Sequence, residues 1–131
     1  MRNRRRSVLI ADNNRAMAQS LRMHLERDGF SVFVAHDLEQ ATILAARQRF
    51  ELMLVSFELP KDGATEFCQH VREELNLTEV PIAICSPAGL EAETESMQYR
   101  FGVSRVFYQP INPANVVAFA TETVEYSVSS N

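Results

Sequence analysis

The sequence predicts an α/β fold, in which five parallel strands form one doubly wound sheet in the order 2-1-3-4-5, with five helices. Short apolar runs alternate strictly with longer segments of helical periodicity, and five such strand–helix units fit the 131 residues of the chain. The third run, Leu52–Val55, is wholly apolar, which is typical of a strand covered by helices on both faces. Because parallel strands need right-handed crossovers, the helices are expected on both faces of an open sheet.

The first part of the chain predicts two strands, each followed by a helix. Asn14 and Asp37 can cap the helices, because their side-chain oxygens can accept a hydrogen bond from a backbone N–H of the first turn. Gly29 can end the first helix. The strands are expected at 8–11 and 31–35, with Met17, Leu21 and Leu25 inward in the first helix and Ala41, Leu44 and Ala45 inward in the second.

The second part of the chain predicts three more strands and three more helices. The segment Leu-Pro-Lys-Asp-Gly at 59–63 has turn chemistry and separates the third strand from its helix. The fourth and fifth strands are expected at 81–85 and 103–108, and Gly102 ends a helix that lies between Leu90 and Phe101. The inward residues are Phe67, Cys68, Val71 and Leu75 in the third helix, and Val116, Phe119, Ala120 and Val124 in a last helix that opens at Asn112 or Pro113.

Composition excludes several classes of protein. The chain is 46% hydrophobic and 23% charged, which is typical of one folded domain and not of a disordered chain. It has no apolar stretch of the length that spans a membrane and no secretory signal, so we expect a cytoplasmic protein. Four of its 13 basic residues stand at positions 2–6, which leaves 9 against 17 acidic residues and argues against nucleic-acid binding by the folded body. We expect a basic N-terminal tail at 1–6, one domain at 7–127 and a C-terminal tail at 128–131.

Polar side chains follow the strands at the edge where a site is expected. In a sheet of this order, the site lies at the carboxyl ends of the strands, at the switch point between the first strand and the third. Asp12 and Asn13 follow the first strand, Ser56 ends the third, Ser86 ends the fourth and Gln109 ends the fifth. We therefore expect these five residues to lie at one edge of the sheet.

The pieces VLIADNN, LMLVSFELPKDG, VPIAICS and FGVSRVFYQPINP, in this order and spacing, resemble a bacterial response-regulator receiver domain (CheY-like). The resemblance runs from Val8 to about the last helix and implies a flavodoxin-like fold. It also implies a phosphorylation site. In the family, an aspartate at the end of the third strand accepts a phosphoryl group and two acidic residues after the first strand help to hold Mg²⁺. A hydroxyl after the fourth strand and a lysine after the fifth contact the phosphoryl group.

Three of these five family positions differ here. Asp12 and Ser86 match, whereas Asn13 replaces the second acid, Ser56 the acceptor aspartate and Gln109 the lysine. An alcohol does not accept a phosphoryl group without a strong base or a separate kinase, and Mg²⁺ needs more than one carboxylate. We therefore expect a degenerate pocket with no catalytic residue, no metal ligands and no cofactor, with Mg²⁺ binding lost or weak. Asp12 would be its central charge, bonded directly or through water by the other four residues.

A contact surface is implied by the same resemblance. In receivers the face formed by the fourth helix, the fifth strand and the fifth helix is the usual dimer or partner surface. Glu91, Glu95, Tyr99, Val106 and Tyr108 would lie on it here. Val106 stands where receivers often carry a Tyr or Phe that swings inward on activation, and a β-branched valine has no such swing.

We therefore predict a pseudo-receiver, a non-enzymatic module of two-component signalling that acts by phosphorylation-independent contact with an unidentified protein or a second copy. It would act alone or as the regulatory domain of a larger response regulator, and would meet nucleic acid only through an output domain not present in this chain. One alternative is a receiver that still responds to phosphoryl transfer in an altered form. Another is a small-ligand sensor in the same cleft, which the glycine-free segment Asp12-Asn-Asn-Arg-Ala disfavours. Glu58 is interpreted as a solvated loop residue rather than a mimic of the phosphoryl charge.

Overall fold

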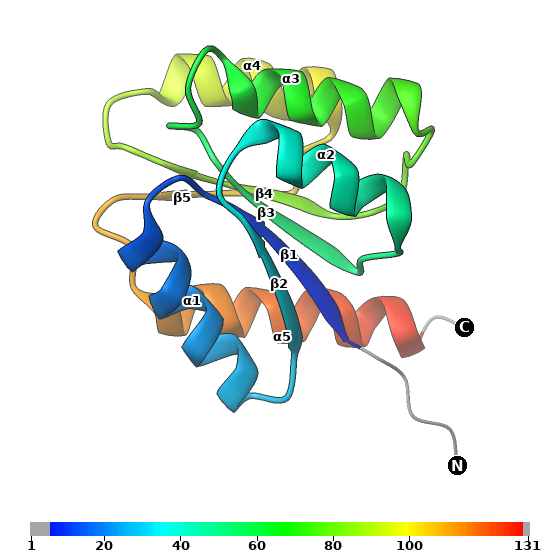
Figure 1. Cartoon of the computed structure of the whole chain (residues 1–131). Coiled ribbons are helices and arrows are strands. Elements are labelled where there is room, and N and C mark those ends of the chain that lie inside the picture. Colours follow the sequence, from blue (N-terminus) through cyan, green and yellow to red (C-terminus); the bar gives the residue numbers. More distant parts are fainter. Residues whose placement is uncertain (1–5, 130–131) are drawn as a thin grey trace.

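The computed structural model describes residues 6–129, and the predicted five-stranded parallel sheet is confirmed. Its strands are β1 (Ser7–Ala11), β2 (Ser31–Ala35), β3 (Leu52–Ser56), β4 (Ile82–Ser86) and β5 (Arg105–Tyr108). Its helices are α1 (Arg15–Arg27), α2 (Leu38–Arg47), α3 (Gly63–Gln69), the π-helical turn η1 (His70–Glu74), α4 (Glu91–Phe101) and α5 (Pro113–Ser129). The strand order is β2-β1-β3-β4-β5, as the sequence predicts. Helices α1 and α5 cover one face of the sheet, and α2, α3 and α4 cover the other (Figure 1).

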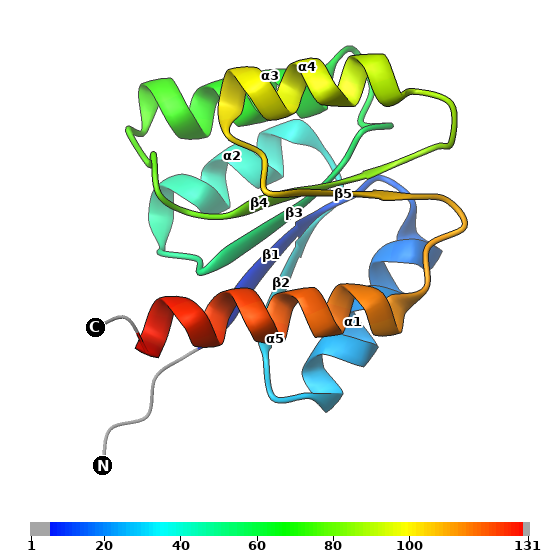
Figure 2. The same ribbon diagram turned by 180° about the vertical axis from the view of Figure 1, so that it is seen from behind.

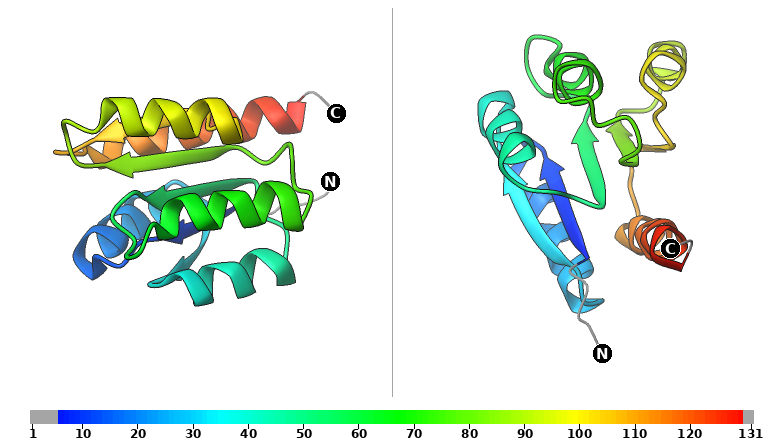
Figure 3. Two further views of the ribbon diagram at one scale, coloured as in Figure 1. Left: turned by 90° about the horizontal axis from the view of Figure 1, so that it is seen from above. Right: turned by 90° about the vertical axis from the view of Figure 1, so that its right-hand side faces the viewer.

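The core consists of two apolar layers, one on each face of the sheet. Leu9, Met53 and Ile84 face α2, α3 and α4, whereas Ile10 and Leu54 face α1 and α5. This division follows from the alternation of side chains along each strand. Every residue of β1, β3 and β4 is buried, which confirms that helices cover both faces of the central strands. Figures 2 and 3 show the same layering from behind, from above and from the side.

Helix ends follow the capping signals of the sequence. The Asn14 side chain accepts a hydrogen bond from the Met17 N–H at 3.0 Å, and the Asp37 side chain accepts one from the Gln40 N–H at 2.8 Å. Gly102 ends α4 with a φ of 66°, a left-handed conformation that glycine adopts without a steric cost.

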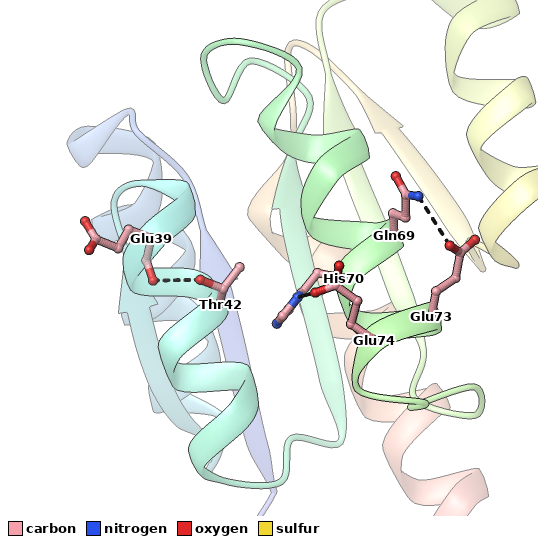
Figure 4. Close-up of polar contacts among 6 residues, drawn as sticks. All are labelled: Glu39, Thr42, Gln69, His70, Glu73 and Glu74. Carbon is pink, nitrogen blue, oxygen red and sulfur yellow. Dashed lines mark hydrogen bonds and ion pairs between the residues drawn. The ribbon is translucent and has the colours of Figure 1, made fainter.

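The third helix differs from the regular helix that its periodicity predicts. After Gln69 it widens into η1, and the Leu75 N–H donates to the His70 carbonyl, five residues back, at 2.9 Å. Polar pairs four residues apart line the outer side of this region (Figure 4). The Gln69 side chain donates to Glu73 at 3.3 Å, and His70 Nδ1 lies 2.6 Å from Glu74 Oε1.

Arg72 leaves η1 toward the amino end of β4 and contacts four backbone carbonyl groups, the longest contact being from its Nη2 to the Gly102 carbonyl at 3.5 Å. Its Nε donates to the Phe101 carbonyl at 2.6 Å, and its Nη1 donates to the carbonyls of Leu77 and Val80 at 2.8 Å each. One guanidinium group thus joins η1 to the loop before β4 and to the end of α4.

The predicted tails coincide only partly with the ends of the described fold. Arg6, assigned to the tail from sequence, contacts the folded body, because its guanidinium carbon lies 4.1 Å from the centre of the Phe30 ring and its Nη2 donates to the Asp28 carbonyl at 3.4 Å. Helix α5 continues to Ser129, past the expected boundary at 127. The remainder of both tails, 1–5 and 130–131, lies outside the described residues. Within 6–129, no helix is both long enough and apolar enough to cross a membrane.

Candidate functional site

The carboxyl ends of the strands bring the predicted site residues to one edge of the sheet. Asp12 follows β1, Ser56 ends β3 and Ser86 ends β4, and these three are only 4%, 6% and 0% exposed. Gln109 follows β5 and is half-buried. Asn13 is exposed, so four of the five predicted residues form the floor and rim of the site.

Asp12 is the buried acid of this edge. Its Oδ1 accepts the Asn14 N–H at 2.9 Å, and its backbone carbonyl lies 3.1 Å from His36 Nδ1. Burial raises the pKa of the Asp12 carboxyl above its ordinary value. The Asn14 N–H acts in the opposite direction, the negative charge of Glu58 raises the pKa further, and His36 lowers it.

The predicted direct bonds between Asp12 and the other site residues do not form among residues 6–124. The Ser56 hydroxyl instead accepts the Glu58 N–H at 3.1 Å, and the Ser86 hydroxyl donates to the carbonyl of the next residue at 2.8 Å. The Gln109 side chain donates to Glu58 Oε1 at 3.2 Å. Ser56 and Ser86 thus bond to backbone groups close by in the chain, and Gln109 bonds to the Glu58 side chain.

Glu58 has a partner that the sequence interpretation missed. The residue is exposed, as expected, but its carboxylate accepts the hydrogen bond from Gln109 and thereby links the loop after β3 to the end of β5. Glu58 lies two residues beyond Ser56 and therefore at the carboxyl edge of the sheet. This position was the one sign in the sequence that Glu58 could contact the other site residues. An amide at 109 suits this contact, because it donates to a carboxylate without adding a charge.

The residues of this edge do not fit the Mg²⁺ ion that the resemblance implies. Mg²⁺ prefers several oxygen ligands in octahedral geometry, with carboxylates among them. Asp12 is a single buried carboxylate with a raised pKa, and its Oδ1 is already bonded to a backbone N–H. Among the described residues, no three His, Cys, Asp or Glu side chains are grouped so that they could hold a metal ion.

Replacing Asp12 by Asn is expected to raise the free energy of unfolding at pH 7 by more than about 0.5 kcal/mol, the usual range of a surface substitution. Because the pKa of the folded carboxyl is raised above 3.8, the folded state binds the proton more tightly, so stability falls as the pH rises from 3.8 through the folded pKa. The asparagine amide does not titrate, so this loss of stability with rising pH disappears. Its carbonyl oxygen can still accept the Asn14 N–H. Urea unfolding should show a gain at neutral pH that shrinks in acid, and equal stabilities at pH 7 would contradict the assignment.

The residues of the predicted contact surface differ in their exposure. Glu91 and Glu95 are exposed on α4, and Tyr99 is 92% exposed. Val106 packs against the core beneath α4 and is half-buried. Tyr108 is also half-buried, and its hydroxyl is engaged inside the fold instead of facing a partner.

The chain is similar to receiver domains over most of its length. The model of the response regulator receiver domain matches residues 8–121. Transcriptional regulatory protein ResD of Bacillus subtilis is 24% identical over 110 residues, which are 84% of this chain and 44% of that protein. Sensor histidine kinase AruS of Pseudomonas aeruginosa is 30% identical over 108 residues, 79% of this chain and 10% of that protein. KDP operon transcriptional regulatory protein KdpE of Escherichia coli is 30% identical over 87 residues, 66% of this chain and 37% of that protein. The chain therefore spans less than half the length of each of these relatives.

Solved structures show the same fold at low sequence identity. A CheY-like receiver domain protein from Methanospirillum hungatei has a TM-score of 0.85 and 20% identity, covering 98% of this chain and 100% of that one. Chemotaxis protein CheY4 of Vibrio cholerae has a TM-score of 0.82 and 21% identity, covering 92% of this chain and 99% of that one. The fold agrees with a family match that runs from the first strand into the last helix, and the chain belongs to the response regulator receiver domain family.

Proposed function

We propose that this receiver domain acts in two-component signalling through protein contacts that do not depend on aspartyl phosphorylation. Receiver domains are in general non-enzymatic signalling modules that interact with protein partners. The observation that carries the proposal is Ser56, a neutral alcohol at the end of β3, where the family resemblance places the acceptor carboxylate. The residue is 6% exposed, and its hydroxyl already accepts the Glu58 N–H.

The chemistry of the surrounding groups supports the same proposal. Ser56 has no hydrogen-bonded base among the described residues, and an alcohol is a weak nucleophile at its free pKa. Gln109 stands at the lysine position and carries no positive charge to pair with a phosphoryl group, and it is bonded to Glu58 instead. The residues at the positions of the phosphoryl acceptor, of one of the two metal-binding acids and of the lysine thus all differ from the family pattern.

The setting of the domain is proposed from its relatives. ResD and KdpE are named transcriptional regulatory proteins, and AruS is named a sensor histidine kinase. We place this domain in such a regulatory context in the cytoplasm, with contact to nucleic acid only through a separate output domain. The partner is another protein or a second copy, docked on the face of α4, β5 and α5.

Treatment with a small acyl phosphate and Mg²⁺, followed by intact-mass measurement, tests the proposal. The expected result is no added phosphoryl group on the wild-type chain. Addition that is lost in Ser56→Ala would overturn the proposal in favour of an altered phosphoryl-accepting receiver. A matched control is the triple variant Asn13→Asp, Ser56→Asp, Gln109→Lys, which restores the family residues and is expected to gain the modification.

An amide NMR titration with Mg²⁺, and then with Mg²⁺ and beryllofluoride, gives an independent readout. No shifts are expected at Asp12, Ser56, Ser86 and Gln109 in the wild type. Saturable shifts at these residues that spread to α4 and β5 would show a working switch and contradict the proposal. A small-ligand sensor would instead reveal itself by a ligand-dependent rise in melting temperature.

A further inference from the structure

A buried pair of hydroxyl groups joins α4 to β5. Thr94 lies in the first turn of α4 and is 0% exposed, and its Oγ1 is 2.7 Å from the hydroxyl oxygen of Tyr108, the last residue of β5. The two residues are 14 positions apart in the chain. The contact therefore belongs to the tertiary structure and fixes the start of α4 against the edge strand β5. Figure 2 shows β5 between α4 and α5.

The direction of the hydrogen bonds follows from the other contacts of Thr94. Its Oγ1 lies 3.1 Å from the Leu90 carbonyl and 3.2 Å from the Glu91 carbonyl, so its single hydrogen is donated within the helix. The Tyr108 hydroxyl is then the donor to Thr94. Tyr108, Thr94 and a helix carbonyl form one continuous chain of hydrogen bonds, and each bond in such a chain polarises the next.

The side chains of β5 leave Tyr108 as the aromatic group that reaches α4. Phe107 points to the opposite face, where it is 6% exposed and packs edge-on against Phe119. Val106 is on the same face as Tyr108 but is β-branched and packs against the core. The one phenol on this side of β5 is therefore held by a fully buried partner.

We propose that the Thr94–Tyr108 hydroxyl pair locks α4 onto β5, so that the face carrying Glu95 and Tyr99 keeps one arrangement. This inference rests on the proposed function, since a contact surface that is used without phosphorylation has to be presented permanently. It assigns Thr94 and Tyr108 a positioning role, whereas the exposed residues of α4 make the contact itself.

Hydrogen exchange of the α4 amides tests the lock in Tyr108→Phe and Thr94→Val, which remove one hydroxyl each and keep the shape of the side chain. We expect exchange across 91–101 to become roughly threefold to tenfold faster in both variants, as loss of one hydrogen bond predicts. Thr94→Ser keeps the hydroxyl and is expected to exchange like the wild type.

Thr42→Val is the matched control for the threonine substitution. The Thr42 hydroxyl donates to the Glu39 carbonyl of its own helix at 2.9 Å (Figure 4), and among the described residues it makes no hydrogen bond to another element. The same chemical change on α2 should therefore leave exchange in α4 unchanged. Acceleration of α4 by Thr42→Val to the same degree would overturn the lock.

Comparing the double variant with the two single variants shows whether the Thr94 and Tyr108 hydroxyls act as one pair or through independent contacts. If the lock is real, Tyr108→Phe with Thr94→Val loosens α4 no more than either single variant does. Additive loosening, or wild-type-like exchange in both single variants, would refute it. A wild-type chain that accepts a phosphoryl group would overturn the proposed function, and the exchange result would still decide whether the lock exists.

Discussion

Arg72→Met is expected to lower the free energy of unfolding by about 3 kcal/mol, because the guanidinium group makes three short hydrogen bonds and one longer one to backbone carbonyls from one partly buried position. The short bonds go to the carbonyls of Leu77, Val80 and Phe101, at 2.8, 2.8 and 2.6 Å, and the longer one goes to the Gly102 carbonyl at 3.5 Å. Methionine fills much of the same volume but offers no donor, so carbonyl groups in the loop before β4 and at the end of α4 lose their partner. Urea unfolding with a common m-value measures the loss.

Two further variants show whether geometry or charge is responsible. Arg72→Lys keeps the positive charge but has no planar fork, and it is expected to lose more than half of the same free energy. Arg22→Met removes an exposed arginine whose Nε lies 3.1 Å from Glu26 on α1, and it should cost less than about 0.5 kcal/mol. Equal effects of Arg72→Met and Arg22→Met would refute the role assigned to Arg72.

The two cysteines are expected to be almost inert in the native protein. Burial raises the pKa of Cys68 and of Cys85 from 9.0 to about 12, and both thiols are free. At pH 8 this lowers the thiolate population about a thousandfold relative to the unfolded chain. Because the more basic thiolate is also the stronger nucleophile, we expect the pKa change alone to make labelling by an aromatic disulfide reagent about thirtyfold to sixtyfold slower.

Labelling in guanidinium chloride supplies the reference for this comparison, since both thiols should then react fully and fast. Cys68→Ala isolates Cys85, which lies next to Ser86 near the site and is 5% exposed. Rapid labelling of Cys85 in the native state would contradict the prediction. Slow labelling that accelerates with pH would agree with a buried thiol of high pKa.

Strand order and helix caps were predictable because they depend on short-range signals. The apolar runs at 8–11 and 52–55 lie in β1 and β3, and Asn14 and Asp37 cap α1 and α2 as predicted. Each of these features is set by the alternation of apolar residues or by one side chain bonding to a backbone group a few positions away. The parallel order then follows from the handedness of the crossovers.

The position of the site was predictable, but its hydrogen bonds were not. Strand ends alone place Asp12, Ser56 and Ser86 at one edge. The choice of hydrogen-bond partner depends on differences of less than 1 Å in the positions of the loops. The side chains of Asp12 and Ser56 accept the backbone N–H groups of Asn14 and Glu58. Periodicity carries no information at that scale.

Two polar residues inside the fold were missed for a related reason. Thr94 stands in the same inward row of α4 as Met97 and Phe101, and a polar residue in an apolar row was a signal of a buried partner. Arg72 gave no such signal, because it stands at the border of the inward row, four positions after Cys68, where an arginine usually extends its charged end to solvent. The spacing of Phe67, Cys68, Val71 and Leu75 fits a regular helix, so it gave no sign of the π-helical turn either.

The π-helical turn η1 also limits how this segment can change in length. A π-turn holds one residue more than an α-turn, and one residue in an α-helix corresponds to a rotation of about 100°. Deleting a single residue between His70 and Glu74 would restore regular winding, but it would rotate the Arg72 guanidinium away from the carbonyls that it contacts. Ala88 and Gly89 are exposed loop residues, so a change in length there does not rotate the side chains of a helix. Insertions and deletions should therefore be tolerated between β4 and α4 and excluded from η1.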